Sequence, residues 1–136
     1  MDLSLIEPEL NEALIEQTKN YLAAVDSGDI DTMERFYDDS FVNIRYDKAG
    51  HAANISKQVF LSMLRKWAQA GDDHPLVAAQ DTTFVATSEY GDCASVLMIR
   101  DKGDETVSYN FVWKQLGTEW RIIREFTFQD ALPNPQ

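Results

Sequence analysis

The sequence has little of the chemistry from which proteins build cross-links and metal sites. Its 136 residues include one cysteine, Cys93, and two histidines, His51 and His74. One cysteine can form no internal disulfide, which fits a reducing compartment. The three side chains are widely spaced and match no zinc-binding pattern, so we expect no bound metal.

Long apolar runs and basic clusters are also missing. No stretch approaches the roughly 18 apolar residues that suggest a bilayer span. The first eight residues, MDLSLIEP, lack the basic start and apolar stretch of a secretory signal, so we expect a cytoplasmic protein without membrane contact. Twelve basic residues against 23 acidic ones give a net charge of −11. Such a field repels phosphate backbones, and we expect no nucleic-acid partner.

What the chain does contain is the composition of a globular domain. The hydrophobic fraction is 44% and the charged fraction is 26%. A chain of this length can bury a core without cross-links. No repeat or linker divides it, so we expect a single domain over residues 1–136, with an ordered core over about 8–130.

The first half predicts helices and the second half predicts strands. Apolar residues recur at helical spacing before Gly28, and Asp29 suits the N-cap of a short second helix that reaches Tyr37. The expected helices span about residues 8–28, 29–37 and 57–71. The expected strands are Phe41–Tyr46, Ala79–Ser88, Cys93–Arg100, Thr106–Leu116 and Trp120–Gln129. Short turns between successive strands favour antiparallel hairpins, so the fold class is α+β, with three N-terminal helices on an antiparallel sheet.

Both faces of this sheet are predicted to be apolar. Alternation places Cys93, Leu97 and Ile99 on one face of their strand, and Ala94, Val96 and Met98 on the other. In the last strand it places Trp120, Ile122, Phe126 and Phe128 together. Helices can cover one face, and we expect a second copy to cover the outer face in a homodimer. The alternative is that curvature hides this face within the monomer.

Three segments carry a resemblance to a known family. Residues 21–30, 36–42 and 113–123 read YLAAVDSGDI, FYDDSFV and WKQLGTEWRII. In this order they resemble the nuclear-transport-factor-2-like superfamily, and most of all its lumazine-binding and polyketide-cyclase-like group. The resemblance spans nearly the whole chain and implies a cone: helices close one side of a strongly curved sheet around an interior pocket, often in a homodimer. Members include isomerases, dehydratases, cyclases, binding modules and assembly domains, so the fold does not determine function.

The ketosteroid isomerase branch of this superfamily offers a chemical comparison. There a tyrosine on the first helix donates to an oxyanion, and a carboxylate on the first strand removes a proton. The resemblance places the tyrosine at Tyr21 and the carboxylate's position at Ile44 or Arg45, neither of which can be that base. A second donor maps near Tyr109 or Asn110. We therefore expect no isomerase of this type, and a hollow without an acidic proton acceptor.

The candidate pocket residues are mostly aromatic. They are Tyr21, Ile44, Tyr46, Trp67, Tyr109, Phe111, Trp113 and Arg124. Tyr21 can offer its hydroxyl to a ligand, or pack in the core and bond to backbone or water. Arg124, on the apolar side of the last strand, can pair with Glu34, Asp38 or a ligand carboxylate, or extend its head into water.

Other motifs are weaker. Asp38 and Asp39 resemble paired catalytic carboxylates, but we expect them to form a helix-to-strand turn. The sequence contains neither a phosphate-cradling glycine loop nor a serine nucleophile elbow, so we expect neither a nucleotide-phosphate site nor a serine-hydrolase site. We also expect no cofactor. The leading hypothesis is a pocket that binds a small apolar or aromatic molecule. The alternatives are a cyclase, dehydratase or isomerase with Tyr21, Tyr109 or Arg124 as electrophilic groups and a base such as His51, or an assembly module without a ligand.

Overall fold

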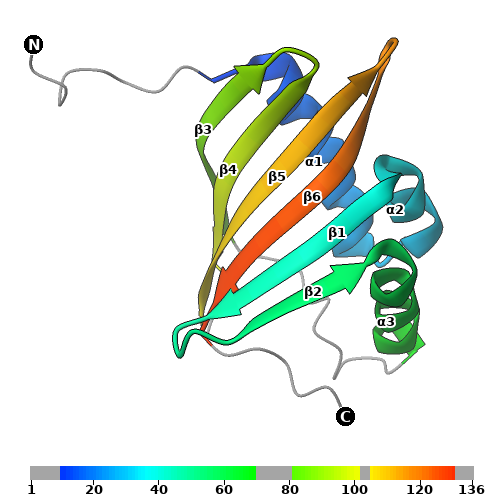
Figure 1. Cartoon of the computed structure of the whole chain (residues 1–136), viewed down its shortest axis with the longest axis vertical. Helices are drawn as coiled ribbons and strands as arrows, with labels where there is room; N and C mark the ends of the chain where they lie inside the picture. The colour runs from blue at the N-terminus through cyan, green and yellow to red at the C-terminus, as the bar shows by residue number, and fades with distance from the viewer. Residues whose placement is uncertain (1–9, 70–80, 102–104, 131–136) are drawn as a thin grey trace, which may run out of the picture.

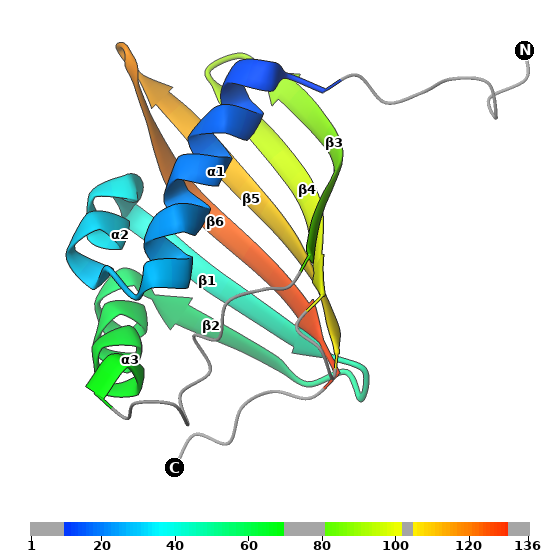
Figure 2. The same ribbon diagram turned by 180° about the vertical axis from the view of Figure 1, so that it is seen from behind.

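The computed structural model describes residues 10–69, 81–101 and 105–130, and within them the helices lie on one face of a large sheet (Figures 1 and 2). The helices are α1 (Glu12–Ser27), α2 (Ile30–Phe36) and α3 (Lys57–Gln69). The strands are β1 (Tyr37–Asp47), β2 (Ala52–Ser56), β3 (Asp81–Tyr90), β4 (Cys93–Asp101), β5 (Thr106–Leu116) and β6 (Glu119–Gln129). The predicted α+β class is confirmed.

Local signals determine where the helices begin and end. Asn11 caps α1 by accepting a hydrogen bond from the Leu14 N–H at 3.1 Å. Gly28 ends α1 in the left-handed conformation, with φ of 69°, which costs glycine little. Asp29 caps α2 through the Thr32 N–H at 3.2 Å, as predicted. The second helix is shorter than predicted, since Tyr37 already belongs to β1.

The sheet is mixed rather than purely antiparallel, which corrects the prediction. Its strand order is β2-β1-β6-β5-β4-β3. The predicted hairpins of β3 to β6 are present, but β1 pairs with β6 in parallel. Short turns reveal hairpins in a sequence, whereas pairing between the first and last strands leaves no local signal.

Strand β2 was not predicted. It pairs with β1 across the turn that follows Asp47, and its residues AANIS combine alanine, asparagine and serine with one isoleucine. These residue types have weak strand propensity, so the pattern alone did not mark a strand. Residues 79 and 80 of the predicted third strand and residues 70 and 71 of the predicted third helix lie outside the described residues.

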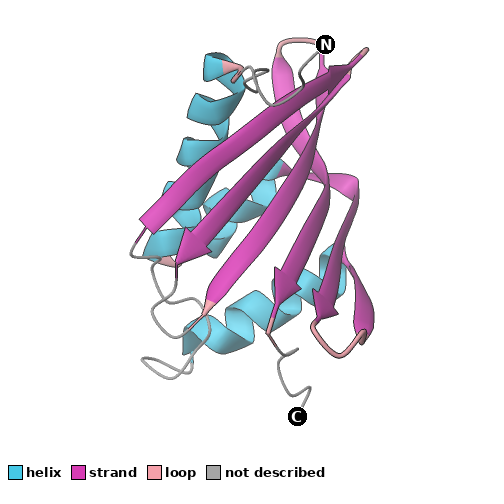
Figure 3. Ribbon diagram, turned by 90° about the vertical axis from the view of Figure 1, so that its left-hand side faces the viewer, coloured by secondary structure: helices cyan, strands magenta, loops and turns pink. Residues whose placement is uncertain are grey.

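The sheet bends around the helices, as the side view shows (Figure 3). Register shifts interrupt the pairing between Tyr37 and Val42, between Phe84 and Ala86, and between Val112 and Trp113. Such bulges increase the local twist and bend of a strand. The result is the cone-like arrangement that the resemblance implied, with an inner face toward the helices and an outer face away from them.

Aromatic side chains fill one end of this cone. The Tyr21 ring meets the rings of Phe36, Tyr37, Phe111 and Trp113 edge-on, at centroid distances of 5.4–6.5 Å. Phe41 stacks on Tyr37 at 4.2 Å. This end is therefore closed by packed side chains.

No helix within the described residues has the length and apolar character needed to cross a membrane.

Candidate functional site

Two neighbouring rows of side chains cross the inner face of the sheet. The deep row comprises Asn43 on β1, Glu125 on β6 and Phe111 on β5, which are register partners. The mouth row lies two residues along each strand, away from the closed end, and comprises Arg45, Thr127 and Tyr109. All three residues of the deep row are buried, whereas Arg45 and Tyr109 are partly exposed. Solvent therefore reaches the inner face at the mouth row.

Glu125 places a carboxylate inside the cone, so the expectation of a hollow without an acid is wrong. Its side chain is 4% exposed. It accepts a hydrogen bond from the Tyr21 hydroxyl at 3.3 Å and a short one from the Asn43 amide. The Tyr37 hydroxyl lies 2.6 Å from that of Tyr21 and can donate to it. Neighbouring donors thus compensate part of the cost of burying this acid.

Burial also fixes the protonation of the two tyrosines. Loss of hydration raises the pKa of Tyr21 well above its ordinary value, and the nearby Tyr37 and Glu125 raise it further. Burial and Glu125 likewise raise the pKa of Tyr37. Both hydroxyls keep their protons at neutral pH and act as hydrogen-bond donors.

A bulge in β6 explains why sequence alternation missed Glu125. Trp113 pairs with Ile122 and Val112 pairs with Arg124, so Ile123 is an extra residue on β6. One extra residue exchanges the two faces for every position that follows. Glu125 and Thr127 therefore turn inward, and Phe126 and Phe128 turn outward. Only the pairing partner reveals such an insertion, because the residue types of β6 favour the opposite arrangement.

Two amide oxygens hold Arg45 in place on the inner face. Its Nε donates to Asn43 Oδ1 at 2.7 Å, and its Nη1 donates to Gln129 Oε1 at 3.1 Å. Its guanidinium carbon lies 5.8 Å from the ring centroid of Phe60 and 6.0 Å from that of Trp67. None of the ion pairs among the described residues involves Arg45.

The second arginine on the inner face is different. Arg100 is 4% exposed, and its Nη2 lies 2.8 Å from both carboxylate oxygens of Asp26 on α1. Its charge is thus balanced within the fold, and the contact ties β4 to the end of α1. The comparison identifies Arg45 as the inner-face cation whose charge has no direct partner among the described residues.

Thr127 adds an unsatisfied group between Arg45 and Tyr109. It is 1% exposed, and its Oγ1 has no hydrogen-bond partner in the part of the chain that the structure describes. Buried hydroxyls normally find a partner, and exceptions need an explanation. The mouth row therefore combines a partly exposed aromatic ring and a partly exposed cation with a buried hydroxyl between them.

The structure brings together only part of the candidate set. Tyr21, Phe111 and Trp113 lie in the closed aromatic end, where they are at most 2% exposed. Trp67 and Tyr109 are partly exposed beside the mouth row. Sequence reasoning missed Asn43, Glu125 and Thr127, and it considered Arg45 only as a position where a base is missing.

Three candidates lie on the outer face instead. Ile44 and Tyr46 alternate with the inward Asn43 and Arg45, and the Tyr46 ring stacks on Phe128 at 5.1 Å. The bulge turns Arg124 outward as well. Its Nη1 donates to the backbone oxygens of Ser40 at 2.8 Å and of Ile123 at 2.6 Å, so it satisfies carbonyls at the irregular parts of β1 and β6 rather than a carboxylate.

The remaining polar candidates have structural roles. Asp38 accepts hydrogen bonds from the Ser40 N–H at 3.0 Å and hydroxyl at 2.6 Å, which lowers the pKa of its carboxyl. Asp38 and Asp39 already belong to β1, so these contacts are local to the strand and the expected turn is absent. His51 lies in the β1–β2 turn, where its ring nitrogen is 2.9 Å from Asp47 Oδ2 and its side chain is 74% exposed. His74 lies outside the described residues.

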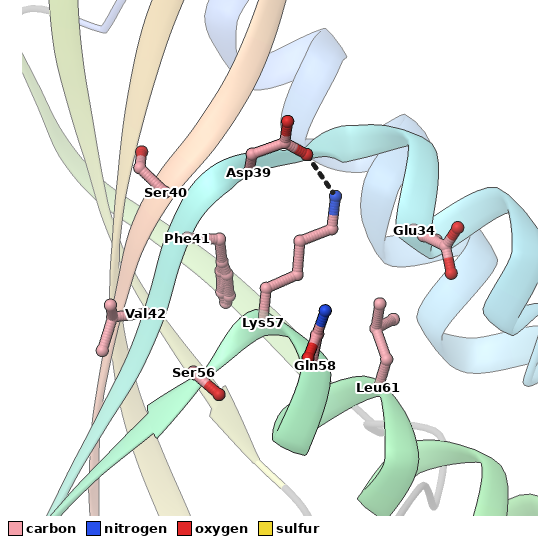
Figure 4. Close-up of a pocket in the computed structure, with 9 residues that line it drawn as sticks. All are labelled: Glu34, Asp39, Ser40, Phe41, Val42, Ser56, Lys57, Gln58 and Leu61. Carbon is pink, nitrogen blue, oxygen red and sulfur yellow. Dashed lines mark hydrogen bonds and ion pairs between the residues drawn. The ribbon is translucent and has the colours of Figure 1, made fainter.

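An open groove of about 600 Å³ lies elsewhere, where the start of β1 meets the start of α3 (Figure 4). Lys57 crosses it to reach Asp39 Oδ1 at 3.3 Å. Its floor includes Phe41, which is 1% exposed and separates the groove from the buried tyrosines. Because its central cation is already paired and its surface is mixed, this groove shows no converging set of ligand-binding groups. The described residues also contain no cluster of three or more side chains suited to hold a metal ion.

Comparison with solved structures identifies the fold. A protein of unknown function from Silicibacter pomeroyi superposes with a TM-score of 0.66 at 20% identity, over 85% of this chain and 92% of that one. A protein from Shewanella baltica gives a TM-score of 0.67 at 11% identity, over 89% and 94%. A third, from Cytophaga hutchinsonii, gives 0.62 at 16% identity, over 90% and 100%. All three are described as NTF2-like proteins.

The chain has the nuclear-transport-factor-2-like fold. The resemblance seen in the sequence is thus confirmed for the fold, and its lumazine-binding subgroup stays a prediction. No family model matches the chain, and no curated protein matches it by sequence. Function must accordingly be argued from the residues of the site.

Proposed function

We propose that the protein binds a small, partly aromatic molecule at the mouth row. The observation that carries the proposal is that Arg45 and Tyr109 on the inner face and Trp67 on α3 are partly exposed, whereas the deep row is buried. Ligand sites combine apolar and aromatic walls with a few converging polar groups. Here the rings of Trp67 and Tyr109 supply the walls, and Arg45 and Thr127 supply the polar groups.

Tryptophan fluorescence tests this proposal, since the three tryptophans differ in position. Planar compounds such as 2-naphthoate and 2-naphthamide would be titrated into the wild type, Trp67→Phe and Trp120→Phe. Trp120 is also partly exposed but lies near the opposite end of β6, so it is the matched control. We expect a saturable change in the wild type and in Trp120→Phe that is lost in Trp67→Phe. A change that survives in Trp67→Phe would contradict this location.

The second candidate function is proton-transfer chemistry, and Glu125 is the observation that favours it. A buried carboxylate can act as a general base, and the protonated tyrosine beside it can act as the electrophilic hydrogen-bond donor. However, both oxygens of Glu125 already accept hydrogen bonds, and neither Glu125 nor Tyr21 is exposed to solvent. We therefore rank binding above catalysis. Deuterium incorporation from D₂O into an enolisable aryl ketone, present in the wild type and lost in Glu125→Gln, would reverse that order.

We further propose that the outer sheet face forms a homodimer. Leu97, Phe126 and Ile44 are joined by register across the outer face, and Ile99, Phe128 and Tyr46 form a parallel row. Such an apolar surface is larger than scattered exposed residues and favours a partner. Asn110 lies between Leu97 and Phe126, and its buried Oδ1 has no partner within the described residues. A twofold axis near Asn110 would let the amide of a second copy satisfy it.

Light scattering at micromolar concentration tests the dimer. We expect the wild type to be dimeric and Phe126→Glu to be monomeric, because the substitution places a charge in the middle of the apolar rows. Val59→Glu is the control, since Val59 is 54% exposed on α3, away from the outer face. A monomeric wild type would exclude the dimer.

A further inference from the structure

We propose that the molecule bound at the mouth row carries a carboxylate, which Arg45 and Thr127 recognise. This inference rests on the proposed binding function and adds the charge of the ligand. Arg45 and Thr127 would bind the polar end of the ligand, whereas Trp67 and Tyr109 would contact its ring. An experiment can therefore reject the carboxylate proposal without rejecting the proposed ring site.

The first observation is the state of the Arg45 guanidinium. Its Nε and Nη1 are engaged by neutral amide oxygens of Asn43 and Gln129, and its Nη2 has no hydrogen-bond partner among the described residues. The group lies against the rings of Phe60 and Trp67, which remove water from its faces. The half-buried guanidinium therefore keeps N–H donors that are not bonded to Asn43 or Gln129. The planar guanidinium of arginine matches the oxygens of carboxylates and of phosphates.

The second observation is independent of the first. Thr127 is the register partner of Arg45 on β6, one strand spacing of about 5 Å away. Its hydroxyl is buried and unpartnered within the described residues, so it can donate to an acceptor that lies beside Arg45. A carboxylate offers two oxygens and can accept from both side chains at once. A ligand amine would instead face a cation.

The buried acid of the deep row does not remove this preference. The Asn43 side chain links Glu125 to Arg45: its amide donates to Glu125, and its carbonyl accepts from Arg45. The Asn43 side chain lies between the two charges, and Arg45 Nη2 has no hydrogen-bond partner in the described part of the chain. The net charge of −11 disfavours anions in general, so the affinity must come from this local contact.

The aromatic neighbours define the rest of the ligand. Tyr109 is the register partner of Thr127 on β5, so its backbone lies about 10 Å from that of Arg45, two strand spacings away. Trp67 on α3 faces Arg45 from the helical side. A fused bicyclic ring that carries one carboxylate fits this spacing. The chemical class is therefore a planar aromatic monocarboxylate.

Calorimetry on the full chain separates the outcomes. The probes are 2-naphthoate, 2-naphthamide and 2-naphthylmethylamine, which share a ring and differ in charge. We expect the wild type to bind the acid about 10- to 100-fold more tightly than the amide, as charged hydrogen bonds allow. The amine should bind least. Equal binding of acid and amide would overturn the carboxylate inference and leave the ring site intact. No binding of any probe would overturn both proposals.

Variants then assign the preference to residues. Arg45→Gln should abolish the difference between acid and amide, and Thr127→Val should weaken acid binding about 3- to 10-fold. Arg124→Gln is the matched control, because Arg124 lies on the outer face of the neighbouring strand. If Arg45→Gln keeps the preference, Arg45 is not the recognition group. The comparison of the three probes in the wild type decides the charge of the ligand even if Arg45→Gln fails to fold.

Discussion

At the scale of single residues, the least expected feature is a glutamate in the core. Glu125, Tyr21 and Tyr37 lie together at 4%, 2% and 0% exposure. Burying a carboxylate is unfavourable unless donors surround it, so this group depends on each of its hydrogen bonds. The residues around it are correspondingly sensitive to substitution.

Replacing Glu125 with glutamine should lower the free energy of unfolding by about 1–3 kcal/mol. The amide keeps the shape of the side chain but turns one acceptor into a donor, which then faces either the Asn43 amide or the Tyr21 hydroxyl. Urea unfolding followed by circular dichroism measures the change. Glu16→Gln is the control, since Glu16 is exposed on α1. Equal stability of the two variants would contradict the network.

The tyrosines predict a loss of stability at high pH. Their pKa values are raised above the ordinary 10.0 in the folded protein. Above about pH 10 the unfolded chain releases these protons while the folded chain retains them, so the folded state binds more protons and stability falls as pH rises. Each such tyrosine contributes up to about 1.4 kcal/mol per pH unit. Below pH 10 this contribution does not change.

Urea unfolding between pH 8 and 11 tests this prediction. Tyr37→Phe should show a shallower decline, because one of the two buried groups no longer titrates. Tyr90→Phe should decline like the wild type, since Tyr90 is 72% exposed. A decline of the same steepness in Tyr37→Phe would show that other groups control alkaline unfolding.

At the scale of elements, α1 is attached to the sheet at both of its ends. At its start, the Asn11 backbone N–H donates to Thr87 Oγ1 at 2.9 Å and its side chain makes a short hydrogen bond to Glu89, both on β3. At its end, Asp26 pairs with Arg100 on β4. These contacts hold Tyr21, in the middle of α1, over the deep row.

Asn11→Ala should therefore lower the free energy of unfolding by about 1–2 kcal/mol, the upper range for an N-cap. It removes both the cap on Leu14 and the contact with Glu89. Asn11→Ser keeps a capping oxygen and should recover most of the loss in urea unfolding. If serine recovers nothing, the contact with β3 rather than the cap is the important part.

The elements also show how far sequence reasoning extends. The caps at Asp29 and Gly28 and the hairpin turns are local, so helices and most strands could be predicted from residue types. The bulge at Ile123 is not local, because it exists only relative to β5. It exchanged the faces of the last strand, and with them Glu125 and Arg124. Trp67 and Tyr109 were predicted as pocket residues from their aromatic side chains, which requires no knowledge of the strand pairing.

At the scale of the whole molecule, the fold presents three surfaces in addition to the closed end of the cone. The outer face is an apolar surface that we assign to a second copy. The closed end of the cone is packed with aromatic rings, and the groove beside α3 carries an already paired lysine. The mouth row remains as the place where rings and a cation are partly exposed beside a buried hydroxyl that has no hydrogen-bond partner among the described residues. Binding at this row is the central claim.

Nuclear Overhauser contacts from bound 2-naphthoate to the protein test that claim most directly, because each surface has its own reporter. We predict contacts from the naphthyl protons to the rings of Trp67 and Tyr109. Contacts confined to Leu61 and Val42, which line the groove, or to Phe128 on the outer face would contradict it.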